Sequence, residues 1–266
     1  MTRFFSITFI VLASLLPSFA TAGSSEAGVA RFPKDKVSAF SNAVQKDLAA
    51  RGARVAIVGR IGRDPRTLPA GVTYTHVAYW VFSQITLSDG TTGQGYRVYN
   101  LYQRANNGGR SDLIQDTPAA FFAGTYKLEA GIIIPDAKLQ AKLLRTISGP
   151  AYAGVHNSNY SVLANPNTNQ FQNCTEHTLN VLMASLYGTN TIGQIKANIT
   201  AYFEPQEISL SGEKRFFAPL VAKGLTTSDH GATVRTATFG SIARFMQKYD
   251  LAKNVYRRTF TRAVRF

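Results

Sequence analysis

The chain has 266 residues, of which 45% are hydrophobic, 11% aromatic and 17% charged. This balance is typical of a globular protein, and it excludes a disordered, collagen-like or coiled-coil chain. Lysine and arginine outnumber aspartate and glutamate by 29 to 15, so the formal net charge is +14 at pH 7. Such a charge attracts any anionic partner without selecting one.

The first 22 residues have the features of a secretory signal peptide. A basic start at Arg3 is followed by an apolar run over residues 4–16 and by the small-x-small sequence ATA at residues 20–22, a pattern that signal peptidases cleave. The alternative is a retained membrane anchor, but the apolar run is shorter than the roughly 18 residues of a spanning helix. We therefore expect residues 23–266 to form a single periplasmic or secreted domain, with no transmembrane segment after signal removal.

Hydrophobic periodicity predicts the helices and strands of this exported part. Apolar residues at helical spacing indicate helices, whereas runs rich in aromatic and β-branched residues indicate strands. The expected helices cover residues 33–52, 136–147, 173–188, 191–202 and 241–249. The expected strands cover residues 53–63, 74–82, 96–103, 125–135 and 159–164, and the second and third form a hairpin across the glycine-rich turn at 88–95.

The helix from residue 173 has the clearest signals at both ends. Asn173 is the expected N-cap, Glu176 is its capping-box partner three positions later, and Gly188 is the stop. The expected buried stripe consists of Leu179, Leu182, Met183 and Leu186. Cys174 lies more than a quarter-turn from the middle of that stripe.

Cys174 is the only cysteine of the chain. Exported proteins usually pair their cysteines in disulfides, so a lone thiol is buried filler, an intermolecular link or a nucleophile. At a helix start, the free N–H groups and the helix dipole are expected to lower the pKa of the thiol. This position and its offset from the apolar stripe favour a nucleophile, and the alternative is a small residue that merely fits the helix start.

A cysteine nucleophile needs a base, and the four histidines of the chain are the candidates. His76 lies in an expected strand, which would hold its ring rigidly. His177 follows Cys174 by three residues on the same helix and is the alternative base. His156 and His230 lie in loop-like sequence, where histidines are more often solvated. With one cysteine and no HExxH spacing, we expect no metal site and no cofactor.

The order of three of these segments resembles the circularly permuted papain-like superfamily, which contains NlpC-type relatives and lecithin:retinol acyltransferase. His76 in THVAYWVF, Asn100 in RVYNLY and Cys174 in QNCTEHTLNVL follow its order of strand histidine, polar residue on the next strand and Asn-Cys helix start. Within that superfamily, the whole mature chain resembles an uncharacterised bacterial family, domain-of-unknown-function family 2145. The resemblance implies an α+β, permuted papain-like fold, in which an antiparallel sheet packs against helices and a helical extension follows at the C-terminus.

The resemblance also implies a role for each residue. Cys174 would be the nucleophile, His76 the general base and acid, and Asn100 the group that orients the imidazole. Many permuted members have a second histidine in place of Asn100, and an amide does not stabilise imidazolium as a carboxylate would. The alternative is that Asn100 is an outward polar residue at a strand edge. The oxyanion would rest on the backbone N–H of Cys174, with Gln172 as a candidate side-chain donor.

Such a site attacks an amide or ester carbonyl, forms a thioester and passes the acyl group to water or another acceptor. We therefore expect an exported thiol hydrolase or acyltransferase whose substrate is a cell-envelope peptide, lipid or protein. The alternative is a non-catalytic envelope binding module for an anionic or acylated ligand. The basic tail at 248–266 is either a solvated surface or a contact to an anionic envelope surface. No nucleic-acid-reading motif accompanies the charge, so no nucleic-acid partner is expected.

Overall fold

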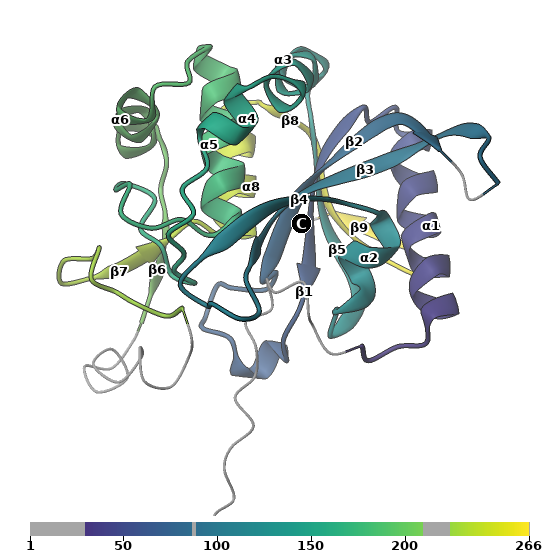
Figure 1. The fold of residues 1–266 in the computed structure, drawn as a ribbon, viewed down its shortest axis with the longest axis horizontal. Helices are drawn as coiled ribbons and strands as arrows, with labels where there is room; N and C mark the ends of the chain where they lie inside the picture. Colours follow the sequence, from purple (N-terminus) through teal and green to yellow (C-terminus); the bar gives the residue numbers. More distant parts are fainter. Residues whose placement is uncertain (1–29, 87–88, 210–223, 266) are drawn as a thin grey trace, which may run out of the picture.

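The computed structural model describes residues 30–86, 89–209 and 224–265 (Figure 1). The expected signal peptide lies outside these residues. Over the described ranges the chain has an α+β fold, with seven α-helices, one seven-stranded antiparallel sheet and one two-stranded sheet. The expected fold class is therefore confirmed at the level of α+β with an antiparallel sheet.

The large sheet has the strand order β4-β3-β2-β1-β5-β8-β9. Its strands are β1 (Val55–Ile61), β2 (His76–Thr86), β3 (Thr92–Gln103), β4 (Ser111–Asp116), β5 (Lys127–Pro135), β8 (Ala252–Thr259) and β9 (Ala263–Arg265). The small sheet pairs β6 (Gln206–Ile208) with β7 (Val234–Thr236). β2 and β3 form the expected hairpin.

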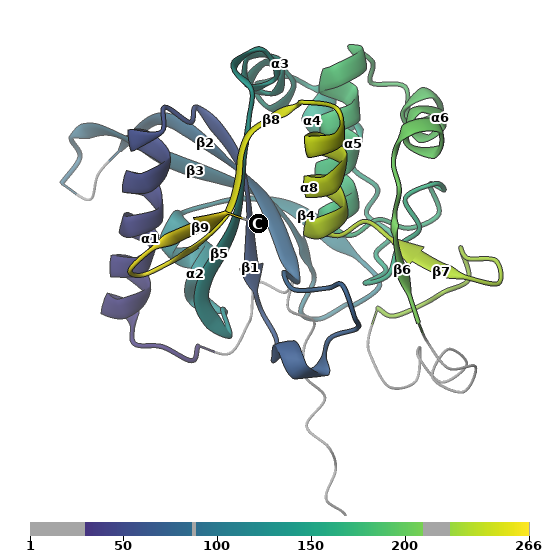
Figure 2. The same ribbon diagram turned by 180° about the vertical axis from the view of Figure 1, so that it is seen from behind.

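Helices cover both faces of the large sheet (Figures 1 and 2). One face carries α1 (Lys34–Ala50) and α2 (Pro118–Ala123), and the other carries α3 (Ala137–Ser148), α4 (Ala151–Gly154), α5 (Cys174–Tyr187) and α8 (Phe239–Lys248). The remaining helix, α6 (Ile192–Tyr202), packs against α5. Side chains of β2 alternate between the two cores, because successive strand residues point to opposite faces. Val77 and Tyr79 belong to the α5 side, whereas Ala78 and Trp80 belong to the α2 side.

Most of the expected elements are present, with three differences. The expected strand at 159–164 is wrong, because this segment forms only isolated bridges, such as Tyr160 to Gln172. β4 and α2 were not expected, since both are short and lack a clear period. The C-terminal segment is not purely helical, because the chain returns after α8 to add β8 and β9 to the sheet. The basic tail is thus largely made of sheet strands.

A close approach of aromatic rings to the sheet requires a glycine in the middle of β5. A Cβ atom at Gly131 would lie 2.6 Å from Cε2 of Tyr74 and 2.8 Å from Cζ of Phe239. Only glycine leaves room for both rings at this point. The arrangement holds the segment before β2 against the sheet, and this segment leads directly into His76.

Candidate active site

The start of α5 places Cys174. The side chain of Asn173 accepts a hydrogen bond of 2.9 Å from the backbone N–H of Glu176, so the expected N-cap is confirmed. Gly188 ends the helix in the left-handed conformation, with φ of +66°. The other half of the expected capping box is absent, because the Glu176 carboxylate pairs with Lys196 on α6. Residues 174–185 are buried around the whole helix, so α5 is a core helix and has no single apolar stripe.

Cys174 is buried rather than displayed, with 3% of its surface exposed. Its side chain packs against Leu101 and Tyr160. Burial raises the pKa of the Cys174 thiol above its ordinary value, although hydrogen bonds from Val77 and Thr175 and the charge of Arg60 act in the opposite direction. The expected lowering of this pKa is therefore wrong, because desolvation of a thiolate outweighs the stabilising effect of the helix start.

The sulfur lies where β2 and β3 separate. Their paired residues run from Thr86 with Thr92 to Tyr79 with Tyr99 and stop there, although β2 begins at His76 and β3 continues to Gln103. We call residues 76–78 and 100–103 the β2/β3 split. Val77 lies in this split, and its backbone is near enough to the Cys174 sulfur to lower the pKa of the thiol in part. The sulfur therefore lies close to the residue that follows His76 in the chain.

His76 and Asn100 form a buried pair in the same split. Both side chains have no exposed surface, and Nε2 of His76 lies 2.9 Å from Oδ1 of Asn100. Because an amide oxygen can only accept, Nε2 must carry the proton, and in the neutral ring Nδ1 then holds a lone pair. Nδ1 is buried and has no hydrogen-bond partner among the described residues. The expected orienting role of Asn100 is consistent with this contact.

The surroundings of His76 keep its ring uncharged. The imidazole stacks on Tyr102 with ring centres 4.8 Å apart, and it lies 5.4 Å from the ring of Phe121 on α2. Burial lowers the pKa of His76 well below its ordinary value, the charge of Arg60 lowers it further, and the Asn100 hydrogen bond partly opposes both. A neutral imidazole at pH 7 is the form that can accept a proton.

Cys174 and His76 reach the split from opposite faces of the sheet. Cys174 begins α5 and contacts Leu101, whereas the His76 ring contacts Phe121 on the α2 side. Within the described ranges no hydrogen bond joins the Cys174 sulfur to His76. The structure thus joins His76 to Asn100 directly, and it places Cys174 at the other face of the sheet, near the backbone of Val77.

The alternative base, His177, has a different setting. It is 2% exposed, and its Nε2 donates to the carbonyl oxygen of Tyr152 at 3.1 Å. Burial lowers the pKa of His177 to about 3. This histidine is committed to fixing α4 against α5, so the structure does not support it as the base.

Two further histidines hold loops rather than being solvated. Nε2 of His156 lies 3.1 Å from the Ser111 hydroxyl, and Nε2 of His230 donates to the carbonyl oxygen of Leu163 at 2.7 Å. Loop position alone does not predict exposure, because a buried backbone carbonyl needs a donor.

Gln172, the candidate oxyanion donor, also has structural partners. Its Nε2 donates to the carbonyl oxygen of Val155 and its Oε1 accepts from the backbone N–H of Asn157, both at 2.9 Å. The side chain is fully buried. Because both ends of the amide anchor the segment after α4, the structure does not support an oxyanion role for Gln172.

Sequence reasoning missed Arg60 and the pocket beside Cys174. Arg60 lies within β1, is 2% exposed and donates to the carbonyl oxygen of Phe121. The available signal was a single cation within the apolar run of β1, which is buried along its whole length. The pocket has a volume of about 210 Å³, and Cys174 lies in its wall. It is built from segments far apart in the sequence, so no local pattern marks it.

The described ranges show neither a metal-binding cluster nor a helix that could span a membrane. Within those ranges, no group of three or more histidine, cysteine, aspartate or glutamate side chains is arranged to hold a metal ion. None of the helices in the same ranges has the length and apolar character needed to cross a bilayer.

The fold and these side chains define an α+β protein with a buried cysteine, histidine and asparagine at a split between two strands. Residues 47–246 match the family described as uncharacterized proteins conserved in bacteria, DUF2145. The chain therefore belongs to this family, and the matched region includes His76, Asn100 and Cys174. No curated protein and no solved structure shows a significant match to the chain.

Proposed function

We propose that this protein is an exported cysteine hydrolase or acyltransferase with a permuted papain-like fold, acting on an amide or ester. One observation carries the proposal. In the β2/β3 split, His76 donates from Nε2 to Asn100 and keeps an Nδ1 with no partner among the described residues, and Cys174 lies against Leu101 at the other face of the same split. A nucleophile, a neutral base and a group that orients the base are the parts that acyl transfer requires.

The mechanism starts from a neutral pair, because the thiol pKa is raised and the imidazole pKa is lowered. As the sulfur attacks the carbonyl carbon, the thiol proton passes to Nδ1 of His76 through a bridging water in the split, because no hydrogen bond joins these two described side chains directly. The imidazolium then gives this proton to the departing amine or alcohol, and the acyl group remains on Cys174 as a thioester. Water or another acceptor attacks the thioester and loses its proton to Nδ1, which restores the thiol when the sulfur leaves. Asn100 holds the ring in the required tautomer throughout.

The oxyanion is assigned to backbone amides at the start of α5. The first N–H groups of a helix have no carbonyl partner within it, and their dipoles favour negative charge. Since Gln172 has partners elsewhere and the Glu176 N–H is taken by Asn173, the backbone N–H groups of Cys174 and Thr175 are the proposed donors. A backbone donor is already fixed before the reaction and needs no reorganisation.

The proposed activity is tested by trapping the acyl-enzyme. Incubating the protein with p-nitrophenyl butyrate and quenching in acid should give a butyryl adduct on the Cys174 peptide in mass spectrometry, because the thioester is an obligatory intermediate. The Cys174→Ala variant should give no adduct and no burst of nitrophenolate. Equal nitrophenolate release by the two proteins, with no adduct, would refute a cysteine mechanism.

The pKa shifts predict how thiol reactivity depends on pH. A raised thiol pKa means that the thiolate fraction is small at pH 6 and continues to grow above the range in which a free thiol is already fully ionised. The rate of alkylation of Cys174 by iodoacetamide should therefore be lower than that of glutathione at pH 6 to 8 and should still rise above about pH 9. An alkylation rate that levels off below pH 7 would indicate a thiolate stabilised by its surroundings, and it would contradict the raised pKa of Cys174.

A binding module without catalysis is the second candidate, favoured by the raised thiol pKa and the 3% exposure of Cys174. In that case the split would be a structural feature, and the +14 charge would attract an anionic envelope ligand. The two functions differ in the trapping experiment, because only the enzyme forms an adduct that depends on Cys174.

A further inference from the structure

The pocket beside Cys174 has an apolar wall. Its apolar lining comes from the segment after β1, from the segment before α5 and from the residues after β7, and it includes Leu68, Pro69, Val72, Val162, Leu163 and Ala237. Threonines, among them Thr75 and Thr175, form much of the rest of the pocket lining. Such a surface gains free energy by taking apolar groups out of water.

The volume of the pocket limits what it can hold. At about 210 Å³ it is smaller than the ligand sites of roughly 300–1,000 Å³ that enclose drug-sized molecules. A long acyl chain or a whole peptide would not fit inside. A short apolar group attached to the carbonyl under attack would fill the space and leave the rest of the substrate outside.

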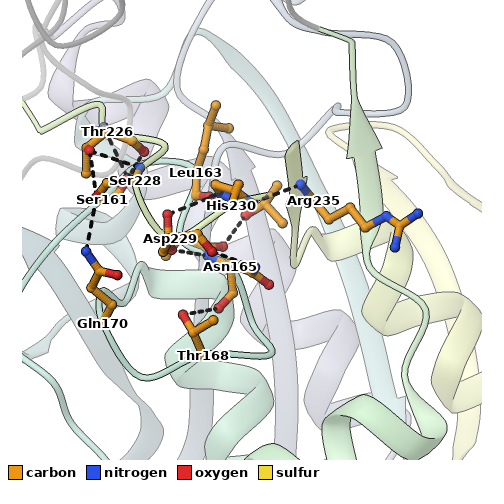
Figure 3. Close-up of polar contacts among 12 residues, drawn as sticks. Ser161, Leu163, Asn165, Thr168, Gln170, Thr226, Ser228, Asp229, His230 and Arg235 are labelled. Atoms are coloured by element: carbon orange, nitrogen blue, oxygen red, sulfur yellow. Dashed lines mark hydrogen bonds and ion pairs between the residues drawn. The ribbon is translucent and has the colours of Figure 1, made fainter. Parts of the chain in front are cut away.

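Polar contacts hold two of the pocket walls in place before any substrate binds (Figure 3). The carboxylate of Asp229 accepts a hydrogen bond of 2.7 Å from the backbone N–H of Asn165. The backbone carbonyl of Asp229 accepts a second one, of 2.9 Å, from the side chain of Asn165. His230 donates from Nε2 to the carbonyl of Leu163, while its Nδ1 accepts from the backbone N–H of Arg235. These contacts tie the 161–165 segment to the 229–235 segment, so the pocket is preformed and little ordering is required on binding.

We infer that this pocket binds the acyl part of the substrate and that this part is a short apolar group. The inference rests on the proposed function and names the substrate class of the same site. Cys174 in the wall would face the carbonyl carbon, the apolar chain would lie against Val72 and Leu163, and the leaving group would remain outside the pocket.

The inference is tested with p-nitrophenyl acetate, butyrate, hexanoate and dodecanoate. We expect kcat/KM to rise at least about tenfold from acetate to hexanoate, since each buried methylene adds binding, and to fall again for dodecanoate. Values of kcat/KM that are independent of chain length would overturn the inference.

A pocket-filling variant tests the location. Val72 is half-buried in the pocket wall, so Val72→Phe should fill the space with little effect on folding. It should lower kcat/KM for hexanoate by at least about fivefold and leave acetate within about twofold. Val264→Phe, a matched change on β9 outside the pocket lining, should alter neither value. Equal losses for both esters, or none, would place the acyl group elsewhere.

Failure of the proposed function and failure of this inference give different results. If no ester acylates Cys174, the enzyme proposal fails, and the pocket is then tested by protection of the thiol from iodoacetamide at pH 9.5. Hexanoate should slow alkylation of Cys174 and acetate should not, and Val72→Phe should remove the difference. Esters that acylate Cys174 without any chain-length preference leave the enzyme proposal standing and overturn the inference alone.

Discussion

Replacing His76 with alanine is expected to lower turnover of p-nitrophenyl hexanoate by about 10²- to 10⁴-fold, which is the usual contribution of a positioned general base. The reason is the tautomer fixed by Asn100, which leaves Nδ1 as the acceptor available for the thiol proton. The loss should appear in kcat, because the ring does not line the acyl pocket. Steady-state kinetics at pH 8, with circular dichroism to verify folding, measures the effect.

Two variants separate a catalytic histidine from one that only supports the fold. His156→Ala removes another histidine, which contacts Ser111 on β4 and not the His76–Asn100 pair, and should retain turnover within about threefold. Asn100→Ala should reduce turnover less than His76→Ala, since the base remains but its tautomer is no longer fixed. If His76→Ala stays folded and turns over as fast as the unchanged protein, His76 is not the base.

Arg60 is placed to act on both side chains of the proposed site. Its charge lowers the pKa of His76, which keeps the proposed base unprotonated, and it opposes the rise that burial causes in the pKa of Cys174. A buried cation near the end of a central strand is costly unless it interacts with other groups, and Arg60 donates to the carbonyl oxygen of Phe121.

The sequence was sufficient for the local features and insufficient for those that depend on distant contacts. The Asn173 cap, the Gly188 stop and the β2/β3 hairpin follow from signals within a few residues, and the structure confirms them. The burial of Cys174 does not, because it depends on Leu101 and Tyr160 from other parts of the chain. For the same reason the sequence predicts a lowered pKa for the thiol, whereas burial raises it. The helix start is only one of several influences on this pKa.

Glu176 shows how a correct motif can lead to a wrong partner. Its spacing from Asn173 matches a capping box, in which the Glu176 carboxylate would accept from the backbone N–H of Asn173. The carboxylate pairs instead with Lys196 on α6, because a cation is a stronger partner for it than an uncharged N–H. The β2/β3 split is likewise not visible in the sequence, because both strands keep their strand-like pattern through the residues at which pairing stops. Interactions between helices and breaks in pairing are decided by tertiary packing.

Replacing Lys196 with methionine is expected to lower the free energy of unfolding by about 3–5 kcal/mol, the usual cost of removing one partner of a buried ion pair. Lys196 is 8% exposed and bonds the Glu176 carboxylate, Asn180 at 3.3 Å and the carbonyl oxygen of Pro166 at 3.0 Å. The variant leaves Glu176 fully buried without its cation. Urea denaturation at pH 7 measures the loss.

The pH dependence of that loss follows from the Glu176 carboxyl. Burial raises the pKa of Glu176 to about 7, the charge of Lys196 lowers it, and Asp229 raises it. Without Lys196 the pKa of Glu176 rises further, so the folded state retains a proton that the unfolded chain releases at its ordinary, lower pKa. Stability of Lys196→Met should therefore fall as pH rises between those two values, and its deficit should be larger at pH 8 than at pH 5.

The double variant Glu176→Gln with Lys196→Met supplies the control. Removing both charges leaves a neutral amide near Asn180, so most of the stability lost in the single variant should return and the pH dependence of the loss should disappear. A double variant as unstable as Lys196→Met would show that lost packing of the lysine stem, rather than an uncompensated carboxylate, is responsible. Since Glu176 lies in the first turn of α5, two residues after Cys174, the same measurement reports how firmly the helix start that carries Cys174 is held.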